Sequence, residues 1–313
     1  MKLLLVDGSA LLHRAYHAYP PLTSKTGQVV GAVYGVASML YSALVEVAPS
    51  HVMVAWDLPK PTFRHEKYVG YKAQRPKADA EMVEQIPIVK EVIAAMGILQ
   101  SEVEGYEADD IIGTLSRLGS SFKDKGVSDQ LEVIILTGDQ DTMQLVDEYV
   151  SILTPPKGKL PAKMYGVDEV LEKYGVIPSQ IVDYKALIGD VSDNIPGVAG
   201  VGPKTAASLL KNFETLERIY RDIKEVQLQF GEIVAKRLMD GRESAYLSQD
   251  LSRIVIDMPL EITLAAMEDR DIKNDNLKSK LEELGFKSLT RRIWGDEERV
   301  TKSKIPDNQM GLF

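Results

Sequence analysis

The chain has 313 residues, of which 44% are hydrophobic and 27% charged, and its formal net charge at pH 7 is −9. This composition is typical of a globular protein with one large domain or two lobes. The absence of cysteine excludes a disulfide framework and a thiolate metal site, and it is compatible with a reducing cytoplasm. No run approaches the ~20 apolar residues of a membrane span, and the run after Met1 is too short for a signal peptide.

The first half of the chain alternates strand and helix patterns, which predicts a mostly parallel central sheet flanked by helices. Apolar runs predict strands at 2–6, 51–56, 98–103, 132–137 and 149–153, the last of which we expect to end the sheet. Helical patterns occupy 9–20, 31–47, 80–96 and 107–118. The polar, basic and aromatic segment 58–80 predicts a long functional connection. From residue 167 onward the pattern is helical, and the polar tail after residue 295 predicts a flexible linker.

Nine acidic residues stand in five places where loops are expected: Asp7, Asp57, Glu107 with Asp109 and Asp110, Asp139 with Asp141, and Asp190 with Asp193. Asp7, Asp57 and Asp139 each follow a predicted buried strand, and ligand sites in open α/β sheets form beyond the carboxyl ends of the strands. Gathered carboxylates repel one another, and divalent cations relieve that repulsion. Hard oxygen ligands without Cys or His favour Mg²⁺ or Mn²⁺. The pattern therefore predicts a metal-dependent enzyme that acts on phosphate chemistry.

Two alternatives apply to these acids. Glu107, Asp109 and Asp110 also suit the first turn of a helix, although one or two acids would satisfy that need. Asp190 and Asp193 are three residues apart, which places both on one helix face or in one tight turn.

The nine acids carry a charge of −9, which equals the net charge of the whole chain. The remainder of the chain is therefore neutral and can present basic patches to nucleic acid.

A glycine-rich stretch at 197–205 precedes an apolar helix, with Pro203 suited to the first helical turn. Free N–H groups at such a helix start can bind a phosphate oxygen, and Lys204 adds a positive charge. This arrangement is typical of a helix-hairpin-helix, which holds a nucleic-acid backbone without reading its sequence. A plain corner between two helices is the alternative.

Together these motifs resemble the 5′ nuclease family: the 5′→3′ exonuclease domain of bacterial DNA polymerase I, phage 5′ nucleases and flap endonucleases. The resemblance covers roughly residues 1–290 and is closest to the polymerase I type, here expected as a free-standing member. It rests on the motifs at 3–9, 14–22, 63–75, 107–110, 137–141 and 189–207.

The resemblance implies a PIN-like, resolvase-like α/β core with a helical arch and a C-terminal helical lobe. The expected nuclease domain covers 1–165, with the arch at 58–96. The expected DNA-binding lobe covers 166–295, with the helix-hairpin-helix at 183–212, and a tail follows at 296–313.

The same resemblance implies roles for individual residues. The inner metal ligands would be Asp7, Asp57, Glu107, Asp109 and Asp139, and the outer carboxylates Asp110, Asp141, Asp190 and Asp193. Lys72 and Arg75 would contact the scissile phosphate, with further substrate contacts from Arg14, Arg64 and Tyr71. The duplex grip would consist of Gly200, Gly202, Lys204 and Thr205, a turn that often also holds K⁺ in this family. Tyr68 and Tyr71 could stack on bases or belong to the core.

The implied function is that of a Mg²⁺-dependent 5′→3′ exonuclease and flap endonuclease with two or more ions, for which Mn²⁺ substitutes. It would act as a monomer on DNA flaps, nicks and RNA primer ends during replication and repair, in the cytoplasm at the nucleoid. The alternatives are a PIN-type ribonuclease, which lacks the glycine-rich hairpin, and a non-catalytic DNA-binding protein, which would not need all nine acids. A haloacid-dehalogenase-type phosphatase would require an acid where Ser9 stands.

The last five residues, 309–313, resemble the pentapeptide that binds the bacterial sliding clamp. Leu312 and Phe313 would enter an apolar pocket of the clamp, and Gln309 would form a hydrogen bond at its rim. The alternative is an apolar terminus that folds back on the core.

Overall fold

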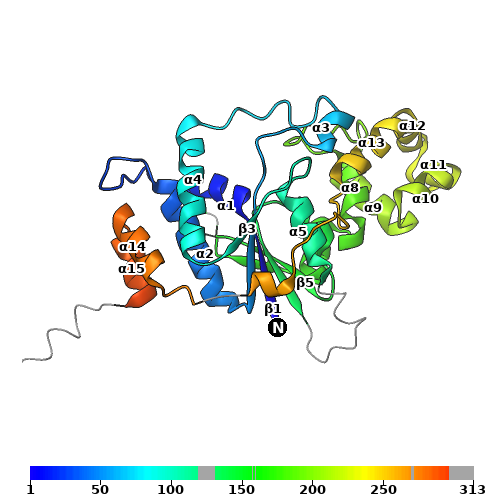
Figure 1. Ribbon diagram of the computed structural model, residues 1–313. Helices are drawn as coiled ribbons and strands as arrows, with labels where there is room; N and C mark the ends of the chain where they lie inside the picture. The colour runs from blue at the N-terminus through cyan, green and yellow to red at the C-terminus, as the bar shows by residue number, and fades with distance from the viewer. Residues whose placement is uncertain (119–130, 157, 159, 269–270, 296–313) are drawn as a thin grey trace, which may run out of the picture.

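The computed structural model describes residues 1–118, 131–156, 158, 160–268 and 271–295. Its centre is a six-stranded sheet in the order β3-β2-β1-β4-β5-β6 (Figure 1). The first five strands are parallel: β1 (Lys2–Asp7), β2 (His51–Ala55), β3 (Leu99–Ser101), β4 (Glu132–Leu136) and β5 (Val150–Thr154). The predicted α/β class, with its mostly parallel sheet, is confirmed.

The expectation that the strand near 149–153 ends the sheet is wrong. A three-residue strand, β6 (Lys163–Tyr165), pairs antiparallel with β5 and forms the edge. Two of its three side chains are exposed and the third is half-buried, so it has no apolar run that sequence periodicity could reveal.

The burial of β1 on both faces of the sheet explains why the strands are continuous apolar runs in the sequence. Leu3 and Leu5 pack into the core cluster on one face of the sheet, and Leu4 and Val6 pack into the cluster on the other face. A parallel strand that is covered on both faces needs apolar side chains at every position. The sheet is therefore the middle layer of three.

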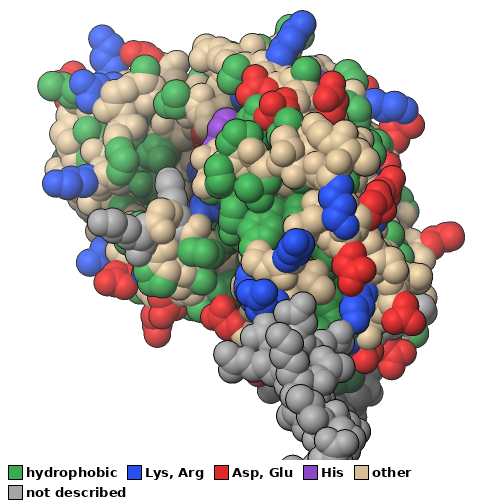
Figure 2. All heavy atoms as spheres, turned by 90° about the vertical axis from the view of Figure 1, so that its left-hand side faces the viewer, with side chains coloured by type: hydrophobic (Ala, Val, Ile, Leu, Met, Phe, Trp, Pro, Cys, Tyr) green, Lys and Arg blue, Asp and Glu red, His purple; other side chains and the backbone are tan. Residues whose placement is uncertain are grey.

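One face of the sheet is covered by helices from both ends of the chain. These are α1 (Gly8–Ala18), α2 (Gly31–Val47), α4 (Ala80–Ala95), α14 (Asp275–Leu284) and α15 (Lys287–Trp294). The hydroxyl of Tyr41 on α2 donates to the carbonyl of Arg292 on α15 at 3.0 Å. Figure 2, which views this side of the molecule, shows charged side chains of both signs around a hydrophobic area.

The other face is covered by α5 (Ala108–Ser116) and by the helical lobe, which extends to the right in Figure 1. The lobe consists of α7 (Val167–Tyr174), α8 (Ile181–Ile188), α9 (Pro203–Phe213), α10 (Leu216–Arg221), α11 (Ile223–Phe230), α12 (Glu232–Asp240) and α13 (Arg242–Ser252). Short 3₁₀ helices are η1 (Asp141–Leu145), η2 (Pro178–Gln180) and η3 (Leu264–Met267). None of the helices among the described residues is long and apolar enough to cross a membrane.

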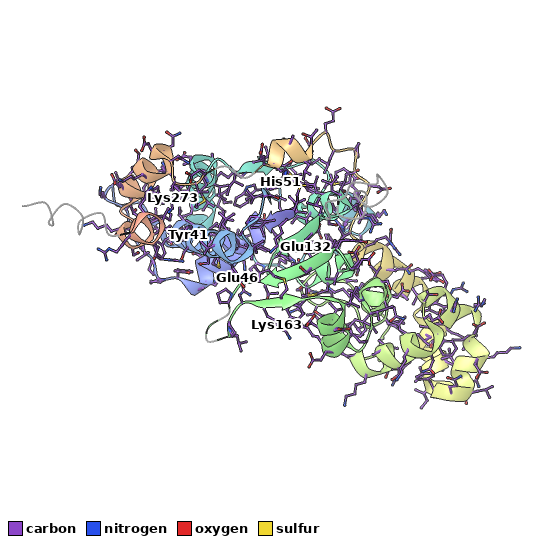
Figure 3. The ribbon with its side chains drawn as sticks, turned by 90° about the horizontal axis from the view of Figure 1, so that it is seen from below. Tyr41, Glu46, His51, Glu132, Lys163 and Lys273 are labelled. Carbon is purple, nitrogen blue, oxygen red and sulfur yellow. The ribbon has the colours of Figure 1, made fainter. Side chains whose placement is uncertain are left out.

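The connection between β2 and α4 passes over the carboxyl end of the sheet (Figure 1). It contains a short helix that the sequence analysis did not predict, α3 (Phe63–Lys67), whose N-cap residue Thr62 donates its backbone N–H to His65 Nδ1 at 3.1 Å. The opposite, amino end of the sheet carries His51 and Glu132, the first residues of β2 and β4, as Figure 3 shows from below.

Candidate active site

Three carboxylates lie at the carboxyl ends of neighbouring strands, as predicted. Asp7 ends β1 and caps α1: its Oδ1 accepts a hydrogen bond from Ala10 N at 2.9 Å, and its Oδ2 accepts one from Thr137 Oγ1 at 2.9 Å. Asp57 follows β2, and its Oδ1 accepts from Ala108 N, in the first turn of α5, at 2.8 Å. Asp139 lies in the loop that follows β4.

The negative charges of these carboxylates repel one another. Burial, followed by the charges of Asp57 and Asp139, raises the pKa of Asp7 to about 7. Burial also raises the pKa values of Asp109 and Asp139. Among the described residues, the Oδ1 atom of Asp109 is shielded from solvent and has no hydrogen-bond partner. An orphaned carboxylate oxygen among acids with raised pKa values fits a site that takes a divalent cation.

Several of the other acids form ion pairs with lysine and arginine side chains. Lys72 Nζ lies 2.8 Å from Glu107 Oε1 and 3.9 Å from Asp193 Oδ2, and Arg75 Nη2 also pairs with Asp193. Asp190 and Asp193 lie in a turn after α8, closed by a bridge between Asp190 and Ile195, and not on a helix.

A residue that the sequence analysis missed is Lys185 on α8. Its ammonium pairs with Asp141, and its Nζ lies 2.6 Å from Asp190 Oδ2. Burial alone would raise the pKa of Asp190, but Lys185 and the hydrogen bonds from Ser192 outweigh it and lower that pKa to about 2. The signal in the sequence is a single lysine within a largely apolar helical stretch that also contains Asp183.

The nine acids thus gather in one region but do not all converge on one point. No three His, Asp or Glu side chains are close enough to hold an ion as they stand, within the part of the chain that the structure describes. Four of the nine acids are engaged in ion pairs with Lys72, Arg75 and Lys185: Glu107, Asp141, Asp190 and Asp193.

Arg64 and Asp110 correct two expectations. Arg64 is 1% exposed and Asp110 is 0% exposed. Arg64 Nη1 and Nη2 lie 2.8 Å and 2.7 Å from the two oxygens of Asp110, and the same guanidinium donates to the carbonyls of Leu251 and Arg253. Asp110 also accepts from the backbone N–H of Val255 and of Glu107. Arg64 Nη1 also lies 3.4 Å from Glu107 Oε2. The buried pair therefore joins α3, α5 and the segment after α13 through hydrogen bonds made inside the protein.

The acids at the start of α5 therefore combine both readings of the sequence. Glu107 is the N-cap, and Asp110 accepts from its backbone N–H at 3.1 Å, which is a helix cap. Glu107 and Asp109 nevertheless face the basic and acidic groups of the site.

Tyr71 also differs from its expected role at the substrate. The side chain is 4% exposed and packs with Ile195 and Leu251, and its hydroxyl donates to Glu107 Oε2 at 3.0 Å. The core alternative holds for Tyr71, because no face of the ring is open for stacking on a base.

The glycine-rich turn is built as the sequence predicts. Gly202 is the N-cap of α9, Pro203 is its first residue, and Lys204 is exposed. Gly200 has φ +79°, and a Cβ there would lie 2.8 Å from Arg237 Nε. A pocket of about 580 Å³ extends from Asp139, Asp141 and Asp190 to Gly202 and Pro203. Three of the nine acids and the start of α9 therefore line one cavity.

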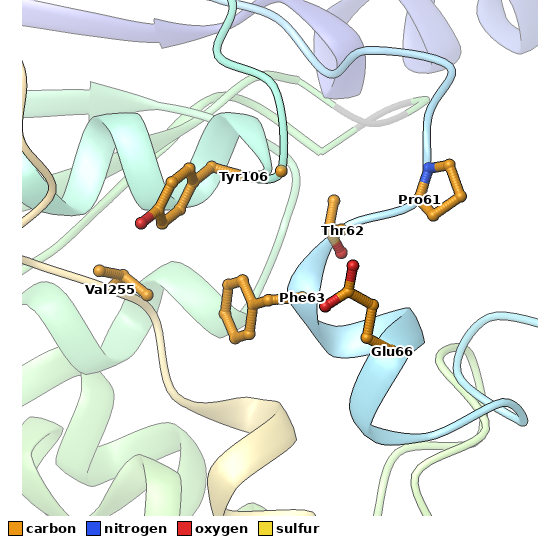
Figure 4. A pocket seen from close by; sticks show the side chains of 7 residues that line it. Pro61, Thr62, Phe63, Glu66, Tyr106 and Val255 are labelled. Carbon is orange, nitrogen blue, oxygen red and sulfur yellow. The ribbon is translucent and has the colours of Figure 1, made fainter.

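Two further features border this region. Arg14 Nη1 on α1 donates to the carbonyls of Pro155 and Pro156, at 3.1 Å and 2.8 Å, beside the loop that carries Asp139. A separate pocket of about 370 Å³ lies behind α3 and is lined by Phe63, Tyr106 and Val255 (Figure 4). It holds none of the nine acids.

Residues 2–175 match the model of the 5′-3′ exonuclease N-terminal resolvase-like domain, and residues 176–275 match that of the 5′-3′ exonuclease C-terminal SAM fold. The chain belongs to the 5′-3′ exonuclease family. The two matched domains meet after residue 175, later than the boundary predicted at 165, and α15 lies beyond both.

Two relatives of known sequence support this family assignment. DNA polymerase I of Bacillus subtilis is 39% identical over 97% of this chain and 33% of its own length. A 5′-3′ exonuclease of Aquifex aeolicus is 37% identical over 93% of this chain and 94% of its own length. This chain therefore spans about a third of the polymerase relative and nearly all of the Aquifex protein.

Solved structures share the fold. T5 5′-exonuclease with bound divalent metal ions (zinc) has a TM-score of 0.65 at 22% identity, covering 91% of this chain and 100% of that one. The catalytic core of Rad2 in complex with DNA substrate has a TM-score of 0.58 at 16% identity, covering 93% and 90%.

Proposed function

We propose that the protein is a Mg²⁺-dependent, structure-specific 5′ nuclease, acting as a monomer. It hydrolyses phosphodiester bonds near the 5′ ends of DNA flaps and nicks and of RNA primers. The observation that carries the proposal is the cavity shared by Asp139, Asp141 and Asp190 with the N-terminus of α9. One wall suits cations, and the other suits a phosphate backbone.

The acids divide into two groups of candidate ligands. Asp7, Asp57, Glu107, Asp109 and Asp139 would hold an inner ion, a role supported by the orphaned oxygen of Asp109 and the raised pKa of Asp7. Asp141, Asp190 and Asp193 would hold a second. When bound, Mg²⁺ or Mn²⁺ ions supply an activated water and neutralise charge on the phosphate.

The basic residues stabilise the charge that develops during cleavage. The side chains of Lys72 and Arg75 are 22% and 48% exposed, so both can reach a phosphate at the rim while their carboxylate partners lie deeper. Positive charge placed where the transition state gains negative charge lowers the barrier. Arg14 is close enough to the Asp139 loop to add a further contact to the substrate.

The duplex would be held at the α9 end of this cavity. The first backbone N–H groups of α9 and the side chains of Lys204 and Thr205 would bind phosphates without reading bases. The carbonyl of Gly200 accepts from Arg237 Nη1 at 2.9 Å, which fixes the turn. A K⁺ ion at the Gly200–Gly202 turn is part of the same proposal.

The C-terminal residues would recruit the enzyme to a sliding clamp. Gln309, Leu312 and Phe313 lie outside the described residues, so the support is the pentapeptide sequence alone. Deletion of residues 309–313 should abolish binding to a bacterial clamp in a calorimetric titration and leave flap cleavage without the clamp unchanged. Equal clamp affinity of the two proteins would remove this part of the proposal.

The experiment that tests the activity compares 5′-labelled flap, blunt duplex, single-stranded DNA and an RNA-primed flap, each with Mg²⁺ and with EDTA. Metal-dependent cutting at the flap junction with a 5′-phosphate product is the expected result. Cutting of single-stranded RNA alone would favour a ribonuclease. Binding of every substrate without cutting would favour a non-catalytic DNA-binding protein.

A further inference from the structure

Two loops at the edge of the candidate active site are joined by direct hydrogen bonds. One is the turn Gly70–Lys72, at the base of the arch, and the other contains Asp193 and Asn194, after α8. The backbone N–H of Lys72 donates to the carbonyl of Asp193 at 2.9 Å. The side-chain amide of Asn194 donates to the carbonyl of Gly70 at 2.7 Å. The turn is therefore braced at both ends by the same neighbouring loop.

The backbone at these contacts is unusual. Within the described residues, four non-glycine residues have positive φ, and two of them are Lys72, at +54°, and Asn194, at +57°. Asparagine adopts this left-handed region more readily than lysine does. A strained conformation persists only where surrounding contacts over-determine it. The hydrogen bonds from Asn194 and to Asp193 are such contacts, and the buried ring of Tyr71 is a third.

The conformation of Lys72 decides where its ammonium lies. With its backbone in the left-handed region, Nζ reaches Glu107 Oε1 at 2.8 Å. An extended or right-handed Lys72 would direct the side chain elsewhere. We propose that Asn194 is a positioning residue that aims Lys72 at the scissile phosphate through its hydrogen bond to Gly70. This inference rests on the proposed nuclease function.

The test variants remove the amide donor of residue 194 and keep its left-handed backbone conformation. Aspartate at position 194 tolerates the left-handed region and has nearly the same size, but an ionised carboxylate donates no hydrogen bond. Glycine also adopts this region without strain. Asn194→Asp and Asn194→Gly should each lower the single-turnover rate of flap cleavage roughly tenfold, as for one lost hydrogen bond, while the Kd for the flap changes less than about twofold.

Asn274 supplies a matched control. Its side-chain amide donates to the carbonyl of Ala95, in another segment of the chain, at 3.1 Å, and it caps α14. Asn274→Asp loses the same kind of donor and keeps a good N-cap residue. It should cleave at the wild-type rate. An equal loss of rate in Asn274→Asp and Asn194→Asp would overturn the inference, since it would trace the effect to general stability.

A double-mutant cycle separates positioning from a local structural role. In a Lys72→Met background, measured with excess enzyme over long incubations, Asn194→Asp should cause no further loss of rate. The same tenfold loss in both backgrounds would show that Asn194 acts independently of Lys72 and would refute the inference.

Hydrogen exchange gives a readout that does not depend on activity. Asn194→Asp should accelerate amide exchange in the peptide that contains Gly70 and Lys72, and exchange in the strands should stay unchanged. Wild-type exchange in that peptide would overturn the inference even where the nuclease activity is present. A wild-type protein that cleaves nothing would instead refute the proposed function, and exchange would still decide whether Asn194 holds the turn.

Discussion

The buried pair of Arg64 and Asp110 makes a quantitative prediction about stability. Arg64→Met removes two charge-assisted hydrogen bonds to Asp110, of 2.8 Å and 2.7 Å, and a longer one to Glu107, of 3.4 Å. It leaves the fully buried carboxylate of Asp110 with backbone donors only. It also leaves the carbonyls of Leu251 and Arg253 without this donor. Removal of one partner from a buried ion pair typically costs about 3–5 kcal/mol. We expect a loss of that size in the free energy of unfolding.

The same helix provides the control. Lys67 Nζ lies 2.7 Å from Asp250 Oδ2, as close as the buried pair, but these side chains are 46% and 52% exposed. Because solvent screens an exposed pair, Lys67→Met should cost only about 0–1 kcal/mol. The two variants therefore compare equal distances at different burial.

Urea unfolding at 25 °C, followed by circular dichroism, measures both variants. Arg64→Met combined with Asp110→Asn should be less destabilised than the sum of the two single variants, because the double variant leaves no unpaired buried charge. A loss below about 1 kcal/mol in Arg64→Met, or equal losses in Arg64→Met and Lys67→Met, would refute the assignment of Arg64 to a structural role.

Further predictions concern the site itself. Asp139→Ala should abolish Mg²⁺-dependent flap cleavage and leave duplex affinity largely intact, because the α9 N–H groups and Lys204 that would bind phosphates remain in place; full cleavage would contradict the assignment. Lys72→Ala should lower the single-turnover rate far more than the affinity, and equal losses would limit it to positioning the backbone. Burial first, and then neighbouring carboxylates, raise the pKa of Asp7 to about 7. The Asp7 carboxyl of the folded metal-free protein thus binds more protons than that of the unfolded chain above pH ~4, so Asp7 should contribute a fall in the melting temperature in EDTA as the pH rises toward 7. Asp7→Asn should flatten that slope. Lys185→Met should tighten Mg²⁺ binding in calorimetry, since the lysine competes for two carboxylates; unchanged affinity would argue against competition.

The sheet and its site were predictable because both depend on local patterns. Apolar runs marked the strands, and Asp7 and Asp139 at their ends located the cluster without any tertiary information. Helix α2 was predicted with its observed bounds, 31–47. The strand β6 was missed because it is largely exposed and has no apolar run, and α3 was missed because five residues are too few for a helical period to show.

The roles of Arg64 and Tyr71 could not be read from the sequence. Both lie in a polar segment that predicts an exposed substrate contact, and their burial depends on partners far along the chain. Asp110 is 46 residues from Arg64, and Asp193 is 122 residues from Tyr71. Only the packing of α3 against α5 and the lobe decides that these side chains point inward.

The ion pairs of the site were hidden for a related reason. A sequence shows nine acids but not which of them a cation reaches, and the lysine on α8 is one of two charged residues in a largely apolar helix. Its position becomes informative once α8 is placed against η1, because Lys185 then stands between Asp141 and Asp190, from two different segments. An acidic cluster thus follows from strand ends alone, whereas the balance of charge within it follows from how the helical lobe docks on the sheet. For that reason the lobe is part of the candidate site and is not only a DNA grip attached to it.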